Sequence, residues 1–239
     1  MCGRYATTRG AVELSSLFDA HDDAGEVVAD YNVAPTDPVP IVRMSDRLGG
    51  RALSIARWGL VPPWARDPKQ GARMINARAE TVATSNAFGP SFARRRCLVP
   101  ADGWYEWMRT GARGRQAYFM TPRDGGVLAF AGLWTTWGAG TDRLMTCSIV
   151  TTAARGELAA VHDRMPLVLA ASRWGAWLAG PTDADSLLVP PADVLISQIE
   201  VRPVGPAVGD VRNDGPGLIE RVAAEPRPPV DDPVDLTLF

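Results

Sequence analysis

The residue of this chain with the most distinctive chemistry is the cysteine at position 2. The chain begins Met1-Cys2-Gly3-Arg4, and removal of the initiator methionine, which is usual before a small residue, leaves Cys2 at the amino terminus. There the α-amine attacks an aldehyde to give an imine, and the neighbouring thiol closes on the imine carbon to give a thiazolidine ring. The amine is a usable nucleophile near neutral pH because its reference pKa is about 7.7–8.0. An internal cysteine cannot react in this way, since its nitrogen is a peptide amide.

Two side chains are candidates for moving protons in such a reaction. Glu106 lies between Tyr105 and Trp107 in an apolar, strand-like stretch. If the aromatic neighbours cover this carboxylate, desolvation raises its pKa and makes it a proton shuttle; if they point the other way, it stays in water. The residues alone leave both interpretations open. His162 precedes a basic residue and a helix-stopping proline, and any imidazole chemistry rests on it, although a single histidine is more often structural.

Few other residues can form an imine or bind a metal ion. Lys69 is the only lysine of the chain and lies in a polar loop at 67–71, so the N-terminal amine is the better candidate for imine formation. The three cysteines and two histidines are scattered, whereas a structural zinc site needs four clustered ligands. We therefore expect no metal and no other cofactor, and we expect Cys97 and Cys147 to be small buried core residues.

Polar and aromatic side chains that suit nucleic-acid binding occur in two stretches. Asn76, Arg78 and Glu80 alternate with apolar residues, which predicts a strand with a polar face on which Arg78 can pair with a phosphate. Prolines between Trp58 and Trp64 predict a stiff loop, and its rings either belong to the core or stack on nucleobases.

Composition and charge limit the class of protein. The chain has 239 residues, 46% of them hydrophobic and 22% charged, which is typical of a globular protein. It has neither a long apolar run nor a secretory signal, and its cysteines are sparse, so we expect a cytoplasmic protein with no membrane partner. The net charge is −2, but residues 225–239 carry −3, which leaves +1 on residues 1–224. With the triplet Arg94-Arg95-Arg96, this distribution allows a local basic groove.

Hydrophobic periodicity predicts alternating strands and short helices. Thr152 is expected to cap a helix that continues to residue 161. A folded domain is expected over 1–224, followed by a mobile acidic, proline-rich tail over 225–239. The expected strands are at about 39–44, 52–58, 116–121, 127–134, 144–151 and 199–204, and the other expected helices are at 11–20, 85–96, 172–179 and 191–198.

Several motifs, in order along the chain, resemble the SOS-response-associated peptidase (SRAP) family. They cover most of the sequence, so the resemblance does not depend on any one of them. The motifs are MCGRY at 1–5, YNVAPT at 31–36, RWGLVPPWA at 57–65, INARAET at 75–81, RRCLVPADGWYEW at 95–107, TTAA at 151–154, HDRMP at 162–166 and RNDGP at 212–216.

The resemblance implies a fold, a reaction, residue roles and a bacterial protein associated with the nucleoid. The fold would be a single α+β domain of curved antiparallel, barrel-like sheets flanked by short helices, with a groove for single-stranded DNA. Cys2 would form a thiazolidine crosslink with the opened sugar of an abasic site. Asn76 would orient the cysteine and sugar, Glu106 would shuttle protons, and His162 would assist ring opening and reversal. Residues that would contact DNA or shape its groove are Arg4, Asn32, Trp58, Trp64, Arg78 and Arg164.

The last five residues resemble the peptide that bacterial DNA polymerase sliding clamps bind. The sequence is Asp235-Leu236-Thr237-Leu238-Phe239, with Asp235 where the motif usually has glutamine. Leu236, Leu238 and Phe239 would be the apolar anchors, and the proline-rich stretch before them would present them to the clamp.

Three other activities are compatible with the same residues. Cys2, His162 and Glu106 can be interpreted as a cysteine (auto)peptidase that removes Met1. The protein can also be a non-covalent reader of modified bases, which would not need Cys2. Finally, an imine can lead to strand cleavage, so lyase activity can accompany crosslinking.

Overall fold

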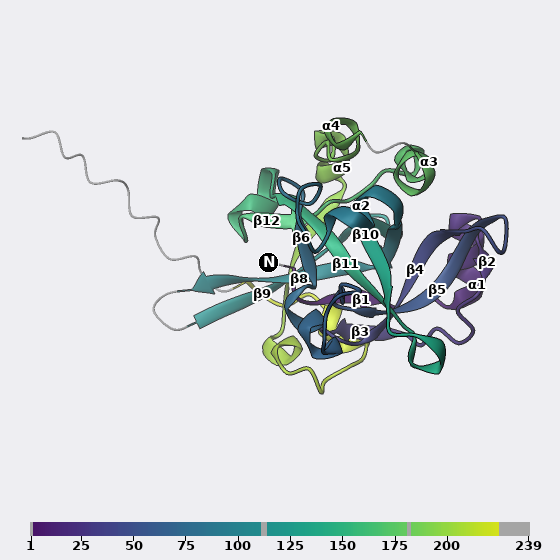
Figure 1. Ribbon diagram of the computed structural model, residues 1–239. Coiled ribbons are helices and arrows are strands. Elements are labelled where there is room, and N and C mark those ends of the chain that lie inside the picture. The colour runs from purple at the N-terminus through teal and green to yellow at the C-terminus, as the bar shows by residue number, and fades with distance from the viewer. Residues whose placement is uncertain (1, 111–113, 181–182, 225–239) are drawn as a thin grey trace, which may run out of the picture.

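Five strands of the larger β-sheet close into a barrel in the computed structural model, which describes residues 2–110, 114–180 and 183–224 (Figure 1). Their order is β11-β10-β7-β4-β5, with antiparallel neighbours. Parallel pairing of Thr146 and Cys147 with Arg57 and Trp58 joins β5 to β11 and completes the ring. The barrel strands are β4 (Pro38–Ser45), β5 (Gly50–Trp58), β7 (Arg96–Ala101), β10 (Leu128–Trp137) and β11 (Leu144–Ala153).

Alternate residues of these strands fill the barrel interior. On β7 the alternating residues Cys97, Val99 and Ala101 belong to the same buried cluster as Phe130 and Ile149. This period of two is what a strand requires, because successive side chains point to opposite faces. The prediction that Cys97 and Cys147 are buried core residues is confirmed.

A second sheet of five strands packs against one end of the barrel. Its order is β13-β9-β8-β1-β3. Tyr5 of β1 and Trp104 of β8 place their rings edge-on against Phe130 inside the barrel, at centroid distances of 6.2 and 5.9 Å. The sheet therefore closes that end with aromatic side chains. Its strands are β1 (Tyr5–Thr7), β3 (Asp30–Val33), β8 (Gly103–Thr110), β9 (Gly114–Pro122) and β13 (Ile199–Val204).

Short helices and three small strands surround the two sheets. Helix α1 buries Leu14 and Phe18, and Phe18 packs on Trp174 of α3 at a ring distance of 4.5 Å. The α-helices are α1 (Ala11–Phe18), α2 (Gly89–Arg94), α3 (Ala171–Ala179), α4 (Ala184–Leu187) and α5 (Asp193–Ser197). The small strands are β2 (His21–Asp22), β6 (Asn76–Arg78) and β12 (Arg164–Pro166), and the 3₁₀ helices are η1 (Pro68–Arg73), η2 (Gly140–Asp142), η3 (Gly156–Ala160), η4 (Pro206–Gly209) and η5 (Pro216–Ile219).

The expected helix over 152–161 is wrong. Thr152 is a buried residue of β11, where it pairs with Met165 of β12, so it caps no helix. Only residues 156–160 turn, as the short 3₁₀ helix η3. Pairing with β12 on one side and with β6 on the other extends β11 through the threonines.

The loop after β5 is fixed by a close approach of two glycines. Gly59 has φ 122°, a conformation that residues with a side chain rarely adopt. A Cβ atom on Gly59 would lie 2.5 Å from the carbonyl oxygen of Gly71, and one on Gly71 would lie 2.4 Å from the carbonyl oxygen of Gly59. The two backbones therefore lie in close contact here, with no room for a side chain at either position.

The structure confirms the predicted α+β class of barrel-like sheets with short helices. No helix among the described residues is long and apolar enough to cross a membrane.

Candidate functional site

Cys2 is held from two sides at the barrel end that the second sheet covers. Its carbonyl oxygen accepts a hydrogen bond of 2.6 Å from Nδ2 of Asn76. Its Sγ lies 3.9 Å from the carbonyl oxygen of Arg4, and the whole residue is buried. In Figure 1 the labels of β6, β8, β11 and β12 surround the start of the chain. Residues distant in sequence thus converge on the residue with the distinctive chemistry.

Asn76 reaches Cys2 because β6 lies parallel to β11. Its position in the register is opposite Ile149, and the Ile149 N–H donates to the carbonyl of Ile75 at 2.9 Å. The Oδ1 atom of Asn76 is buried and has no hydrogen-bond partner among the described residues. One end of the amide therefore holds Cys2, while the other end offers an acceptor to a bound molecule.

Glu106 comes to the site on β8. The Tyr105 N–H donates to the carbonyl of Arg4 at 3.0 Å, which places the following residue beside the start of the chain. Glu106 is only 3% exposed, so the structure decides the open question in favour of a covered carboxylate. Burial raises its pKa to about 7, and the positive charge of the chain's amino terminus acts against this rise. Near neutral pH this carboxyl can both donate and accept a proton.

The thiol of Cys2 is held in its neutral form. Burial raises the pKa of the Cys2 thiol, and the negative charge of Glu106 raises it further. A thiol in these surroundings is a weaker nucleophile than a thiolate. A reaction that begins with the thiolate of Cys2 is therefore disfavoured at this site.

His162 lies between η3 and β12 with its side chain 26% exposed. Its Nδ1 lies 2.9 Å from the backbone N–H of Arg164 and also 2.9 Å from Oδ1 of Asp163. Burial lowers the pKa of His162, as does the positive charge of the amino terminus, whereas Asp163 opposes this effect. Asp163 also raises the pKa of Glu106, which places the histidine loop within electrostatic range of that carboxyl. His162 is therefore a neutral hydrogen-bonding group near pH 7.

Arg164 and Arg78 lie on the outer side of β12 and β6. Arg164 donates to Oε2 of Glu80 at 3.0 Å and to the carbonyl of Thr151 at 2.7 Å. Arg78 and Glu80 are exposed while Ala77 and Ala79 are buried, which confirms the predicted polar face. The role of both arginines as phosphate contacts stays a prediction.

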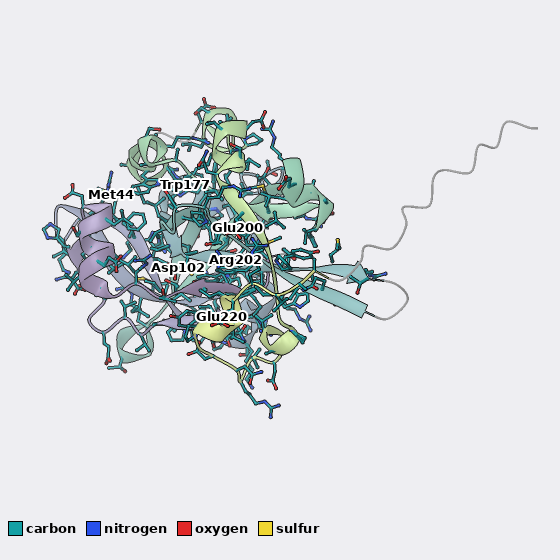
Figure 2. The ribbon with its side chains drawn as sticks, turned by 180° about the vertical axis from the view of Figure 1, so that it is seen from behind. Met44, Asp102, Trp177, Glu200, Arg202 and Glu220 are labelled. Atoms are coloured by element: carbon teal, nitrogen blue, oxygen red, sulfur yellow. The ribbon has the colours of Figure 1, made fainter. Side chains whose placement is uncertain are left out.

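Arg4 and Asn32 form a lock with the segment 206–214. Arg4 Nη1 donates to Oδ1 of Asn32 at 2.8 Å and to the carbonyl of Val208 at 3.0 Å. Asn32 Nδ2 donates to the carbonyls of Asp210 and Asn213 at 3.0 and 2.9 Å. The segment 206–214 therefore fixes residues 2–4, which lead into β1. Just before this segment in the chain, Glu200 binds Arg202 and Arg221, and Figure 2 shows Glu200 beside Arg202.

Two of the side chains predicted to contact DNA or to shape its groove are buried. Asn32 is 3% exposed and its amide is fully engaged in the lock. Trp58 has no exposed surface, its ring lies 5.2 Å from that of Tyr5, and its Nε1 donates to the carbonyl of Ile75. Both side chains support the Cys2 end from inside and have almost no surface for direct contact, and their part in shaping a groove stays a prediction. Trp64, on the same stiff loop, is 61% exposed and keeps its ring available.

Sequence reasoning missed the hydroxyl of Tyr5. It is fully buried and has no hydrogen-bond partner among the described residues. Burial raises the pKa of Tyr5, and the neighbouring Cys2 raises it further. Its place in the first motif, three residues from Cys2, was the available signal.

Within the described part of the chain, no group of three or more His, Cys, Asp or Glu residues could hold a metal ion. The residues 225–239, with Leu236, Leu238 and Phe239, lie outside the described residues.

The barrel, the covering sheet and the buried N-terminal cysteine agree with a family-level comparison. The family model described as SOS response associated peptidase (SRAP) matches residues 1–211. The chain belongs to this family. It is 35% identical over 226 residues to abasic site processing protein YoqW of Bacillus subtilis, covering 92% of this chain and 99% of YoqW. It is 34% identical over 229 residues to abasic site processing protein YedK of Escherichia coli, covering 93% and 100%.

More distant relatives share the same domain. Abasic site processing protein HMCES of Gallus gallus is 30% identical over 261 residues, covering 90% of this chain and 76% of the relative. A crystal structure of a protein from Bacteroides thetaiotaomicron superposes with a TM-score of 0.80 at 22% identity, covering 93% of this chain and all of that one. At that identity the likeness bears on the fold alone.

Proposed function

We propose that this protein crosslinks itself to abasic sites in single-stranded DNA through Cys2, after loss of Met1, and so protects the site during replication and the DNA damage response. Relatives at 30–35% identity are named abasic site processing proteins. The observation that carries the proposal is the position of Cys2, which is bound by Asn76 and faces Glu106, a carboxyl with a pKa of about 7.

The proposed reaction has two bond-forming steps. An abasic sugar is mostly a closed hemiacetal, so Glu106 and His162 first move the proton that opens it to the aldehyde. The α-amine of Cys2 then adds to the aldehyde carbon and one water leaves, giving the imine. Finally the thiol adds to the imine carbon while its proton goes to the nitrogen, which gives the thiazolidine. The net change is the joining of protein and DNA with loss of one water.

The remaining residues would bind and orient the strand. Asn76 would use its unpartnered Oδ1 to orient the opened sugar, as its Nδ2 holds Cys2. Arg78 and Arg164 would position the phosphates and Trp64 would stack on a base, which requires no sequence preference. Arg4 would act by holding Cys2 in place through the lock.

The test combines denaturing gel electrophoresis with intact mass. Purified protein is mixed with a single-stranded oligonucleotide that has one abasic site, beside a Cys2→Ala control. We expect a band that resists denaturation and a mass equal to the protein without Met1 plus DNA minus one water. Absence of the adduct, from protein whose mass confirms loss of Met1, would overturn the proposal.

The main alternative is a cysteine peptidase, and the electrostatics do not favour it. Such an enzyme pairs a thiolate with a protonated imidazole. Here the pKa of the Cys2 thiol is raised and that of His162 is lowered, which favours the neutral pair. Cys2→Ser discriminates, because it keeps the amine but cannot form the thiazolidine. A non-covalent reader of modified bases would survive loss of Cys2, and strand cleavage by the imine would appear beside crosslinking.

We also propose that residues 235–239 bind the DNA polymerase sliding clamp and bring the protein to replication forks. The sequence Asp-Leu-Thr-Leu-Phe supplies three apolar anchors. Deletion of 235–239 should abolish binding to the purified clamp in calorimetry, with crosslinking unchanged. Equal clamp binding by the deleted and full chains, or none by the full chain, would contradict this.

A further inference from the structure

The barrel has a second end, far from Cys2, with an opening into its interior. A cavity of about 310 Å³ lies there, lined by Arg43, Trp134, Thr136, Arg143 and Met145, a set that we call the barrel mouth. Trp134 and Met145 pack against the interior core cluster, so the cavity continues the inside of the barrel. Trp134 follows Phe130 by four residues on β10, which is about 13 Å along a strand. Phe130 contacts the Tyr5 and Trp104 rings at the Cys2 end.

Figure 1 shows the same separation in space. The hairpin of β10 and β11 runs from the middle of the molecule, near the start of the chain, to the opposite side. The barrel mouth therefore does not belong to the Cys2 site, and none of its residues takes part in the proposed reaction.

Arginine side chains converge on this mouth. The guanidinium groups of Arg43 and Arg95 lie 5.0 and 5.6 Å from the ring centroid of Trp134. The Arg43 side chain is only 12% exposed, and its buried Nε has no hydrogen-bond partner among the described residues. The positive charges of Arg47 and Arg143 both act on Arg43. A guanidinium stays charged under all ordinary conditions, so this repulsion is not relieved by proton loss.

Acidic partners compensate these charges only in part. Asp23 lies 3.3 Å from Nη2 of Arg43, and it is shared with Arg47 at 2.5 Å. A partly buried arginine with an unfilled donor and two like charges nearby is an anion site by its chemistry. Planar donor pairs suit the oxygens of phosphate in particular.

The basic surface extends from the mouth along the outside of the barrel. Arg95 donates to Oγ1 of Thr135 at 3.0 Å and, with Arg94 and Trp64, lines a neighbouring hollow of about 280 Å³. The arginine triplet of the sequence is thus divided, since Arg96 is buried and binds backbone carbonyls of Phe92, Trp177 and Gly180. Trp64, Arg94 and Arg95 line a path toward the mouth, where the Arg95 guanidinium lies over the ring of Trp134.

We propose that the barrel mouth binds a phosphate ester, through Arg43 and Arg143 held against Trp134. Two sources supply this chemistry: a free nucleotide, or a phosphate of a DNA strand that follows the Arg94–Arg95 path. The strand alternative rests on the proposed function, whereas the nucleotide alternative does not.

The first arm of the test is calorimetry of the full chain with thymidine monophosphate and with thymidine. We expect the monophosphate to bind at least about tenfold more tightly, since one charge-assisted contact contributes about 1.5–3 kcal/mol. The Arg43→Gln/Arg143→Gln variant should lose that difference, and Arg123→Gln, an exposed arginine elsewhere, should keep it. Arg143→Gln alone should weaken binding as well, and because Arg143 is exposed this variant does not depend on the buried Arg43.

The second arm uses undamaged single strands of about 4 and about 16 nucleotides, the range of common site sizes, with Cys2→Ala protein to prevent crosslinking. The quantity measured is the slope of the logarithm of the binding constant against the logarithm of the salt concentration, which we call the salt slope. If a DNA strand reaches the mouth, loss of both arginines should reduce the magnitude of this slope by about 1.4 for the long strand and leave that of the short strand unchanged. A change in only the first arm identifies a free phosphate ester. Equal behaviour of wild type and variants in both arms would overturn the site, whereas failure of crosslinking at Cys2 would overturn the proposed function alone.

Discussion

At the Cys2 end of the barrel a carboxyl is buried, that of Glu106, whereas at the mouth a guanidinium is largely buried, that of Arg43. Glu106 is 3% exposed and its pKa is raised to about 7, so burial has changed its protonation near neutral pH. Arg43 is also desolvated, but a guanidinium keeps its charge. The same physical cause therefore has different outcomes. Burial of a carboxyl raises its pKa and produces an acid–base group. Burial of a guanidinium leaves its positive charge in place, which favours binding of an anion.

The largest effect that tests this contrast is loss of the Glu106 carboxyl. Glu106→Gln should lower the single-turnover rate of crosslinking by about 10²–10⁴-fold, the usual contribution of a general acid–base group. The exposed Glu157 provides the matched control, since Glu157→Gln should leave the rate unchanged. A Glu106→Gln rate within about threefold of wild type would mean that burial of this carboxyl does not serve proton transfer.

The lock provides the next largest effect. Asn32→Ala removes the acceptor of Arg4 and the donor to the segment 206–214, so the free energy of unfolding should fall by about 1–3 kcal/mol in urea. The lock also holds Arg4, and with it the segment from Cys2 to β1. Alkylation of Cys2 in the folded protein should therefore become faster. Mass analysis of the peptides after digestion measures this rate.

Cys97 and Cys147 are internal standards for this experiment, because both are buried in the barrel. Faster alkylation of Cys2 alone indicates local release of the N-terminal strand. Equal acceleration at all three cysteines would indicate general unfolding and would contradict a positioning role for the lock.

A smaller effect is expected in the pH dependence of stability. The raised pKa of Glu106 means that the native state binds this proton more tightly than the unfolded chain, whose value is 4.5. The carboxyl thus favours the native state below about pH 4.5, and this contribution is lost as pH rises to about 7. Glu106→Gln has no such loss, so it should gain about 1–3 kcal/mol over wild type between about pH 5 and about pH 8. A constant difference across this range would show that Glu106 is not buried in solution.

The smallest effect belongs to the mouth. Arg143→Gln should leave the free energy of unfolding within about 0.5 kcal/mol of wild type, since it is an exposed side chain. The salt slope for a long single strand should nevertheless fall by about 0.7, the value for one phosphate contact. A slope that is unchanged, measured by fluorescence anisotropy, would restrict strand binding to the Cys2 end.

Much of the fold was predictable from local patterns. The strands expected at about 39–44, 52–58 and 144–151 lie within β4, β5 and β11, because short apolar runs between turn residues favour strands. The helix expected after Thr152 was wrong because a threonine before an apolar run also suits a strand. Pairing with Met165 of β12 decides between them, and that pairing joins residues whose order in the chain gives no local signal.

The candidate site was predictable in its residues but not in its arrangement. Cys2, Asn76, Glu106 and His162 stand out by type and motif. The covering of Glu106 depends on β8 lying beside residues 2–4, which local sequence cannot specify. Likewise Trp58 and Trp64 belong to the same motif, yet one is fully buried and the other 61% exposed. The closure of the barrel at β5 and β11 makes this difference.

The lock between Arg4 and Val208 has a consequence for the protein during its synthesis. The two residues are 204 positions apart, so Cys2 leaves the ribosome long before the segment that fixes it. Throughout most of translation the reactive terminus belongs to a growing chain without its final partners. The site is therefore complete only when almost all of the domain has been made. The lock cannot form until Val208 has been synthesised.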